Sequence, residues 1–162
     1  MRLSRSVVTI TPAMLEALSV GAQNLTNGIS SHNVWPVYSI TLAPAPGAGM
    51  LLIPMNISFV YSYGTVPFTI STNNGFGMQL GNCQASQSWV DAMNPTLLNT
   101  LLSRSSGIQQ YPYLMDLTST TMDVRNLPYI FYLVDGTISE GNGILTATTD
   151  YLIYPISDFN GT

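Results

Sequence analysis

The side chains that could support nucleophilic catalysis are few in this sequence. It has one histidine, His32, in a polar Ser-Ser-His-Asn segment, and one cysteine, Cys83. Because a serine or cysteine nucleophile needs a base held against it, a Cys83–His32 pair is the dyad to consider. A single thiol is more often a small buried hydrophobe, and a histidine in a polar loop is usually solvated. We therefore expect no enzyme of this class.

The carboxylates offer two candidate pairs for acid–base catalysis, Asp116 with Asp123 and Asp135 with Glu140. Asp135 precedes a glycine, and Glu140 precedes a Gly-Asn-Gly sequence, so turn formation explains the second pair better than catalysis. The chain has no His-x-x-x-His, Cys-x-x-Cys or Asp-x-Asp-x-Asp-Gly spacing, and its paired glycines do not open a helix after a strand. We expect no catalytic residue, no metal site and no cofactor.

Charge is scarce in this chain and negative on balance. Four arginines, no lysine and eight carboxylates give a net charge of −4 and make up 7% of the residues, where a soluble domain carries about 25%. This balance argues against nucleic-acid binding, which needs clustered cations. The apolar stretch 50–55 is interrupted by Pro54 and is far shorter than the roughly 20 residues that span a bilayer, so we expect no membrane segment. Without a secretory signal pattern, synthesis in a cytoplasm is expected, where the chain stays or is assembled into something larger.

The apolar content points to assembly with partners. Apolar residues make up 46% of the 162 residues, which leaves too few charges to cover a free monomer in the usual way. Such a monomer would expose more apolar surface than soluble monomers tolerate. We expect an obligate homo-oligomer, with a trimer as the predicted state.

The periodicity predicts a single all-β domain over residues 1–162. Residues 5–11, 34–42, 50–63, 129–134 and 145–153 have strand patterns, and residues 68–72 and 76–80 flank Asn-Asn-Gly, the signal of a hairpin. Pro54 predicts an edge position or a bulge, and the Pro-Ala-Pro-Gly-Ala-Gly segment 44–49 predicts a rigid hairpin-like turn. Thr11-Pro12 opens a short helix over residues 12–18, and residues 86–106 form a leucine-rich helical insert. The fold expected is an antiparallel β-sandwich or jelly-roll-like barrel with one or two short helices.

Two segments are candidates for protein contacts. Arg2 and Arg5 precede the first clear strand, so residues 1–5 are expected to form an arm whose arginines reach a partner's carboxylates. The alternative is a frayed tail whose arginines aid solubility. Tyr111 and Tyr113, in a Tyr-Pro-Tyr segment after the leucine-rich insert, are the other candidates, because tyrosine is enriched at interfaces.

The order of these motifs resembles that of small virion proteins of tailed bacteriophages. The resemblance is carried by Thr-Pro-Ala-Met-Leu at 11–15, Ile-Thr-Leu-Ala-Pro-Ala-Pro-Gly-Ala-Gly at 40–49, Tyr-Ser-Tyr-Gly at 61–64, and the closing strand at 142–151. It implies a head decoration or cement protein, or a minor tail protein, built as a compact β-barrel or jelly roll that often trimerises. The insert at 86–106 and Met50, where a lysine is usual, depart from the pattern.

The resemblance leaves two functional classes open. The first is a structural virion protein that binds itself and the major capsid protein or a tail protein. The second is a receptor- or glycan-binding module associated with the tail or fibre, since β-sandwiches also serve as lectins. Low charge and high apolar content favour permanent assembly, and hence the first class.

Overall fold

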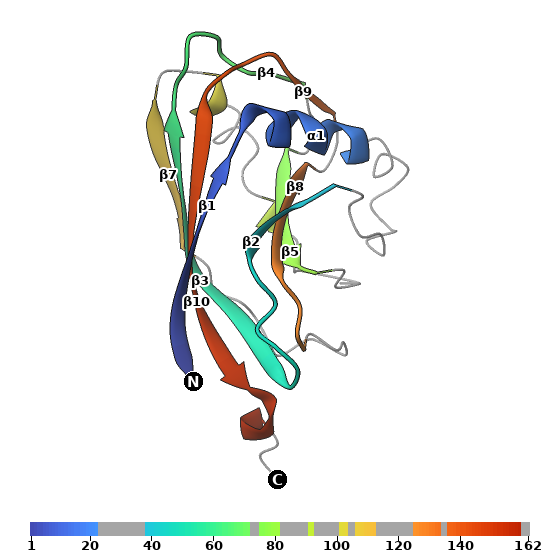
Figure 1. The fold of residues 1–162 in the computed structure, drawn as a ribbon, viewed down its shortest axis with the longest axis vertical. Coiled ribbons are helices and arrows are strands. Elements are labelled where there is room, and N and C mark those ends of the chain that lie inside the picture. Colours follow the sequence, from blue (N-terminus) through green and yellow to red (C-terminus); the bar gives the residue numbers. More distant parts are fainter. Residues whose placement is uncertain are drawn as a thin grey trace.

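The computed structural model describes residues 1–22, 38–71, 75–81, 91–92, 101–103, 106–112, 125–133 and 136–159. Within these residues, two four-stranded antiparallel sheets face each other, and a helix and a small two-stranded sheet lie at one end (Figure 1). This arrangement confirms the expected all-β sandwich.

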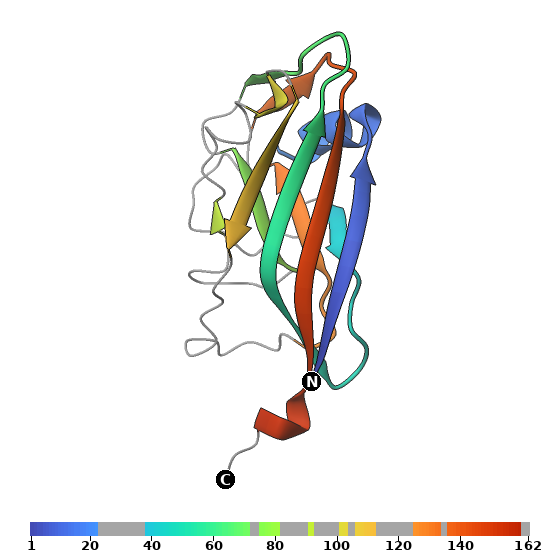
Figure 2. The ribbon, with the colours of Figure 1, turned by 90° about the vertical axis from the view of Figure 1, so that its left-hand side faces the viewer.

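The first sheet contains the longest strands of the molecule and is seen face-on in Figure 2. Its order is β1 (Arg2–Ile10), β10 (Ile144–Pro155), β3 (Met50–Ser62) and β7 (Gly107–Pro112). The order in the second sheet is β2 (Ile40–Ala43), β8 (Tyr129–Leu133), β5 (Phe76–Leu80) and β6 (Asp91–Ala92). The small sheet pairs β4 (Thr69–Ser71) with β9 (Thr137–Ser139), and a 3-10 turn, η1 (Ile156–Phe159), follows β10.

Aromatic side chains hold the two sheets together. Phe59 of β3 meets Phe131 of β8 with ring centroids 5.4 Å apart, and Phe131 stacks on Phe76 of β5 at 5.1 Å. All three are fully buried. Gly77 of β5 lies against Tyr132, where an added Cβ would come within 2.6 Å of the ring carbon Cζ. The Tyr132 ring therefore lies over Gly77, in the space that a side chain at this position would occupy.

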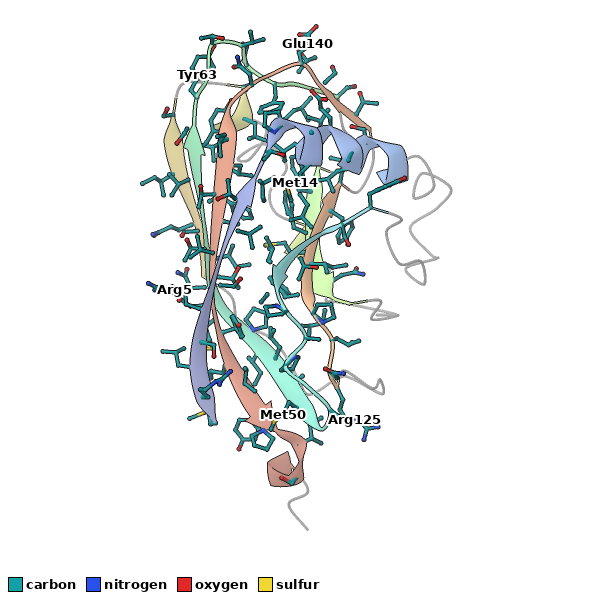
Figure 3. All side chains as sticks on the ribbon, viewed as in Figure 1. Arg5, Met14, Met50, Tyr63, Arg125 and Glu140 are labelled. Atoms are coloured by element: carbon teal, nitrogen blue, oxygen red, sulfur yellow. The ribbon has the colours of Figure 1, made fainter. Side chains whose placement is uncertain are left out.

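Helix α1 (Pro12–Ala22) covers one end of the sandwich, as the Thr11-Pro12 pair predicts. The hydroxyl of Thr11 accepts a hydrogen bond from the amide of Met14 at 3.4 Å, which is an N-cap. Leu15 and Leu18 are buried, and Met14 points from the helix toward the core (Figure 3). The helix is fastened to β9 through Ser19, whose hydroxyl accepts from the Ile138 amide at 2.7 Å and donates to its carbonyl at 3.1 Å.

The proline- and glycine-rich segment 44–49 passes from one sheet to the other. Gly47 and Gly49 have φ values of 110° and 72°, the positive range that glycine adopts without strain. Asn126 fixes the turn, because its side-chain oxygen accepts from the Gly47 amide at 2.9 Å. The tight turn is as predicted, but it joins β2 to β3 across the sandwich, so the hairpin-like geometry expected at one end of a single sheet is wrong.

Pro54 lies at a bulge in an interior strand. The register of β10 and β3 pairs Asp150 with Asn56 and Tyr151 with Pro54, so Met55 is the extra residue. The bulge is one of the two positions expected for this proline. β3 lies between β10 and β7, but β7 pairs with it only from Asn56 to Tyr61. Among the described strands, Pro54 therefore has a partner on the β10 side alone, which agrees with the local edge position also expected for it.

Two other local expectations are corrected by the topology. The hairpin expected between residues 68–72 and 76–80 is wrong, because β4 pairs with β9 while β5 pairs with β8 and β6. The insert 86–106 is not helical throughout, because Asp91–Ala92 is strand β6. Within the insert, Leu101 and Leu102 are helical and buried. The remaining positions of the insert, except residues 103 and 106, lie outside the described residues.

Phe131→Ala tests the aromatic contact between the sheets. Because Phe131 packs against one aromatic ring from each sheet, the substitution should lower the free energy of unfolding by about 3–5 kcal/mol, and Phe131→Leu by clearly less. Urea denaturation measures both. Val60→Ala, on the outer face of β3, is the control and should change stability by no more than about 0.5 kcal/mol. Equal losses for Phe131→Ala and Val60→Ala would contradict this account of the core.

Candidate interaction surface

The residues considered for catalysis are mostly beyond the described part of the chain. His32, Cys83, Asp116, Asp123 and Asp135 lie outside the described residues. Glu140 has a φ of 56°, and its carboxylate accepts a hydrogen bond from the Thr69 hydroxyl at 3.1 Å. It therefore occupies a turn, as its sequence context predicts. Within the described ranges, no three His, Cys, Asp or Glu side chains are grouped so as to hold a metal ion, and no helix is long and apolar enough to cross a membrane.

The N-terminal segment is part of a sheet. β1 begins at Arg2, and its register with β10 is unbroken from Arg2 opposite Ile153 to Ile10 opposite Leu145. The expected arm over residues 1–5 is therefore wrong for residues 2–5. The strand is difficult to recognise in the sequence because its half-buried side carries the small polar residues Ser4 and Ser6. Backbone pairing with β10, and not burial of large side chains, holds this part of the chain in place.

Arg5 forms an ion pair within its own sheet. It lies directly opposite Asp150, and its Nε and Nη2 donate to the two carboxylate oxygens at 2.6 and 3.0 Å. These bonds lower the pKa of Asp150, and a hydrogen bond from Asn56 on β3 acts in the same direction. Figure 3 shows Arg5 on the side of the sheet that faces away from the second sheet. The guanidinium of Arg5 therefore already has a carboxylate partner within the chain, whereas the sequence predicted that it would bind a carboxylate of another protein.

The same outer face of the first sheet is low in charge and partly apolar. We define it as the outward-pointing residues of β1, β10, β3 and the Ile108 position of β7, and call it the outer sheet face. Its exposed apolar side chains are Leu3 (69% exposed), Val7 (62%), Val60 (36%), Ile108 (66%) and Ile144 (43%). Between them lie hydroxyl side chains, namely Ser58, Ser62, Thr9, Thr146 and Thr148. A face of this kind is suited to packing against another protein.

One of the two tyrosine candidates lies in a different setting from the one expected. Tyr111 is the fifth residue of β7 and pairs with Ile57, so it belongs to an edge strand and not to a loop. Tyr113 lies outside the described residues.

The outer sheet face was missed by the sequence analysis, although a signal for it exists. Along β10, the buried residues Leu145, Ala147 and Tyr151 alternate with Thr146, Thr148 and Asp150. That alternation identifies a solvent-facing side of β10. Its extension over neighbouring strands depends on the order of strands in the sheet, which periodicity does not reveal.

Comparison with known proteins gives little to place the chain in a family. No family model matches it, and no curated protein matches it. One similar solved structure is a chain described as the cyanophage Pam1 capsid asymmetric unit, with 10% sequence identity and a TM-score of 0.40. The alignment covers 93% of this chain and 82% of that one.

Asp150→Asn tests the role of the ion pair through the pH dependence of stability. Because the folded state lowers the pKa of Asp150 below its ordinary value of 3.8, the carboxylate stabilises the fold above that pH, and this contribution is lost as pH falls through the folded-state pKa. Wild type should therefore lose slightly more stability than the variant between about pH 4 and pH 2. Chemical denaturation at a series of pH values measures the difference. Parallel pH profiles would contradict it.

Deleting residues 1–5 tests whether this segment is a strand or an arm. The deletion removes the pairs made by residues 2, 3, 4 and 5 of the nine-residue strand, so it should lower the Tm by about 5 °C or more. The double substitution Arg2→Gln and Arg5→Gln is the matched control, because it removes both charges and keeps the backbone. Calorimetry should show the larger drop for the deletion. A deletion variant as stable as wild type would contradict the strand and support the interpretation of residues 1–5 as an arm.

Proposed function

We propose that this chain is a structural protein of a bacteriophage virion, which assembles with itself and binds the head shell as a decoration or cement protein. The observation that carries the proposal is the outer sheet face. It exposes Leu3, Val7 and Ile108 at 62–69% on a chain in which only 7% of residues are charged. A surface of this kind favours permanent contacts with other proteins over a free monomer in solution.

The strand order supports the same proposal. β1 pairs with β10, β2 with β8, β3 with β7, and β5 with β6, and the two resulting four-stranded sheets face each other. This nested pairing fits a jelly roll, an architecture used by viral capsid proteins as well as by lectins and cupins. Because one fold serves several functions, the virion role draws its further support from the sequence motifs that resemble small bacteriophage virion proteins.

The proposal assigns the chain no catalytic role. Three pairs of polar side chains in the described part of the chain form structural bonds: Arg5 with Asp150, Thr69 with Glu140, and Asn142 with Thr65. Each of these contacts fixes one strand or turn to another. The function proposed is therefore mechanical, with the major capsid protein or a second virion protein as the partner.

Labelling of the intact particle tests the virion role. Antibody fragments raised against the purified chain would be imaged by electron cryomicroscopy on virions of the phage that encodes it, with fragments against an unrelated protein as the control. We expect label at regularly repeated positions on the head. Label confined to the tail would overturn the head-shell role and favour a receptor- or glycan-binding module. Particles without label would overturn the virion role altogether.

A further inference from the structure

Strand β1 forms a long edge of the first sheet. Within the described strands it borders β10 on one side, and Figure 2 shows it at the margin of the sheet. Such an edge directs about half of its backbone donors and acceptors outward, where another strand can pair with them. Proteins usually block edges of this kind with charged side chains, proline, bulges or short strands. β1 has nine residues, an unbroken register and no proline. Its two charged residues are Arg2, at one end, and Arg5, which is paired with Asp150 of the same sheet.

Within the described residues, the other edge strands of the two large sheets are shorter than β1. β7 has six residues and ends on Pro112. β2 has four residues and is followed by Pro44, and β6 has two residues. β1 is therefore the one strand at a sheet margin, among those described, that offers a full-length template for pairing.

We propose that β1 pairs antiparallel with β1 of a second copy of this chain, across a two-fold axis at Ser6, so that the two four-stranded sheets become one continuous sheet. This inference deepens the part of the proposed function in which the chain assembles with itself. Such an interface is isologous, because each copy contributes the same strand.

The register follows from the length of the strand and the position of its charges. Ser6 is the midpoint of Arg2–Ile10, so centring there pairs all nine residues. It places Arg5 opposite Val7 of the second copy. The nearest alternative registers are shifted by two residues, because a shift of one would move side chains to the opposite face of the sheet. A shift in one direction brings the two Arg5 side chains opposite each other. A shift in the other direction pairs only residues 4–10. Like charges directly opposite each other are unfavourable, so the Ser6-centred register is preferred.

The side chains of β1 are complementary in this arrangement. Val7 is 62% exposed in the single chain, and it would gain the hydrocarbon stem of Arg5 from the second copy as a neighbour. Arg2 would lie opposite Ile10, beside the first turns of α1, where Glu16 is exposed. In one chain Arg2 and Ile10 are separated by eight residues, roughly 27 Å of strand. The second copy thus brings an exposed cation close to an exposed anion at both ends of the interface.

This arrangement favours a second copy over an unrelated strand as the occupant of the edge. An unrelated extended segment would satisfy the backbone of β1 but would not by itself supply the Arg2–Glu16 and Val7–Arg5 complementarity. Because the pairing is two-fold, it produces a dimer, in contrast to the trimer that the sequence resemblance implies.

Sedimentation velocity on the purified full-length chain and three variants tests the proposal. We expect wild type to be a dimer at micromolar concentration. Val7→Lys places a cation opposite Arg5 of the second copy at two positions per dimer and should weaken dimerisation about tenfold or more. Val7→Glu places an anion there and should keep the dimer. Ile108→Lys, at the similarly exposed position on β7, is the control and should dimerise as wild type does.

Hydrogen exchange gives a second measurement that does not depend on the variants. In the wild-type dimer, amides along the whole of β1 should be protected, whereas dilution to monomer should release those that point away from β10. A wild-type monomer or trimer would overturn the proposal. Equal weakening by the Lys and Glu variants at Val7, or by Ile108→Lys, would also overturn it.

The two proposals can fail separately. A chain that dimerises through β1 but is absent from particles would overturn the virion role and leave the β1 interface in place. A chain that is found on the head but is monomeric, with exposed β1 amides, would overturn the β1 interface and leave the virion role in place.

Discussion

The pairing of β3 with β10 is the interaction on which the rest of the structure depends. It runs through twelve register pairs, from Ile144 opposite Ser62 to Pro155 opposite Met50. Both strands are interior, so β1 and β7 attach to the sheet only through them. Pro54 lies within this ladder next to the bulge at Met55, beyond the part of β3 that pairs with β7. The inner side of the ladder also supplies Phe59, which meets Phe131 of the opposite sheet.

The other strand pairings join the first half of the chain to the second half in an antiparallel arrangement. β1 with β10, β2 with β8, β3 with β7, and β5 with β6 form a nested series, in which each early strand finds its partner later in the chain. The pairings β3–β10 and β5–β8 then roll this ribbon into two sheets. Asn142 secures one end of the roll, because its side-chain oxygen accepts from the amides of Thr65 and Val66 at 2.7 and 2.9 Å. Most contacts therefore join distant parts of the sequence, and disrupting one strand removes support from two others.

Features decided by a few neighbouring residues could be predicted from the sequence. The N-cap at Thr11, the alternation of β10 and the positive φ of Gly47 and Gly49 are of this kind. The choice of strand partners could not be predicted. An Asn-Asn-Gly segment indicates a hairpin, yet β4 pairs with β9, which is distant in the sequence. The first half of β1 could not be predicted for the same reason, because its position depends on pairing with β10. The outer sheet face was missed because it exists only once four strands are ordered side by side.

The position of Arg5 changes how this chain can recognise a partner. Its charge is matched within the sheet by Asp150, so the outer sheet face has little net charge with which to attract a partner over a distance. In the proposed dimer, recognition would depend on backbone hydrogen bonds, apolar area and shape, which salt screens weakly compared with exposed ion pairs. Contacts of this type are slow to form but persist, as a permanent assembly requires. β1 carries two charged residues, Arg2 and Arg5, and Arg5 is matched by Asp150. An edge with so little unmatched charge also allows wrong partners to pair with it. A second copy paired with β1, as proposed above, would cover this edge with one specific neighbour and so keep other strands from pairing with it.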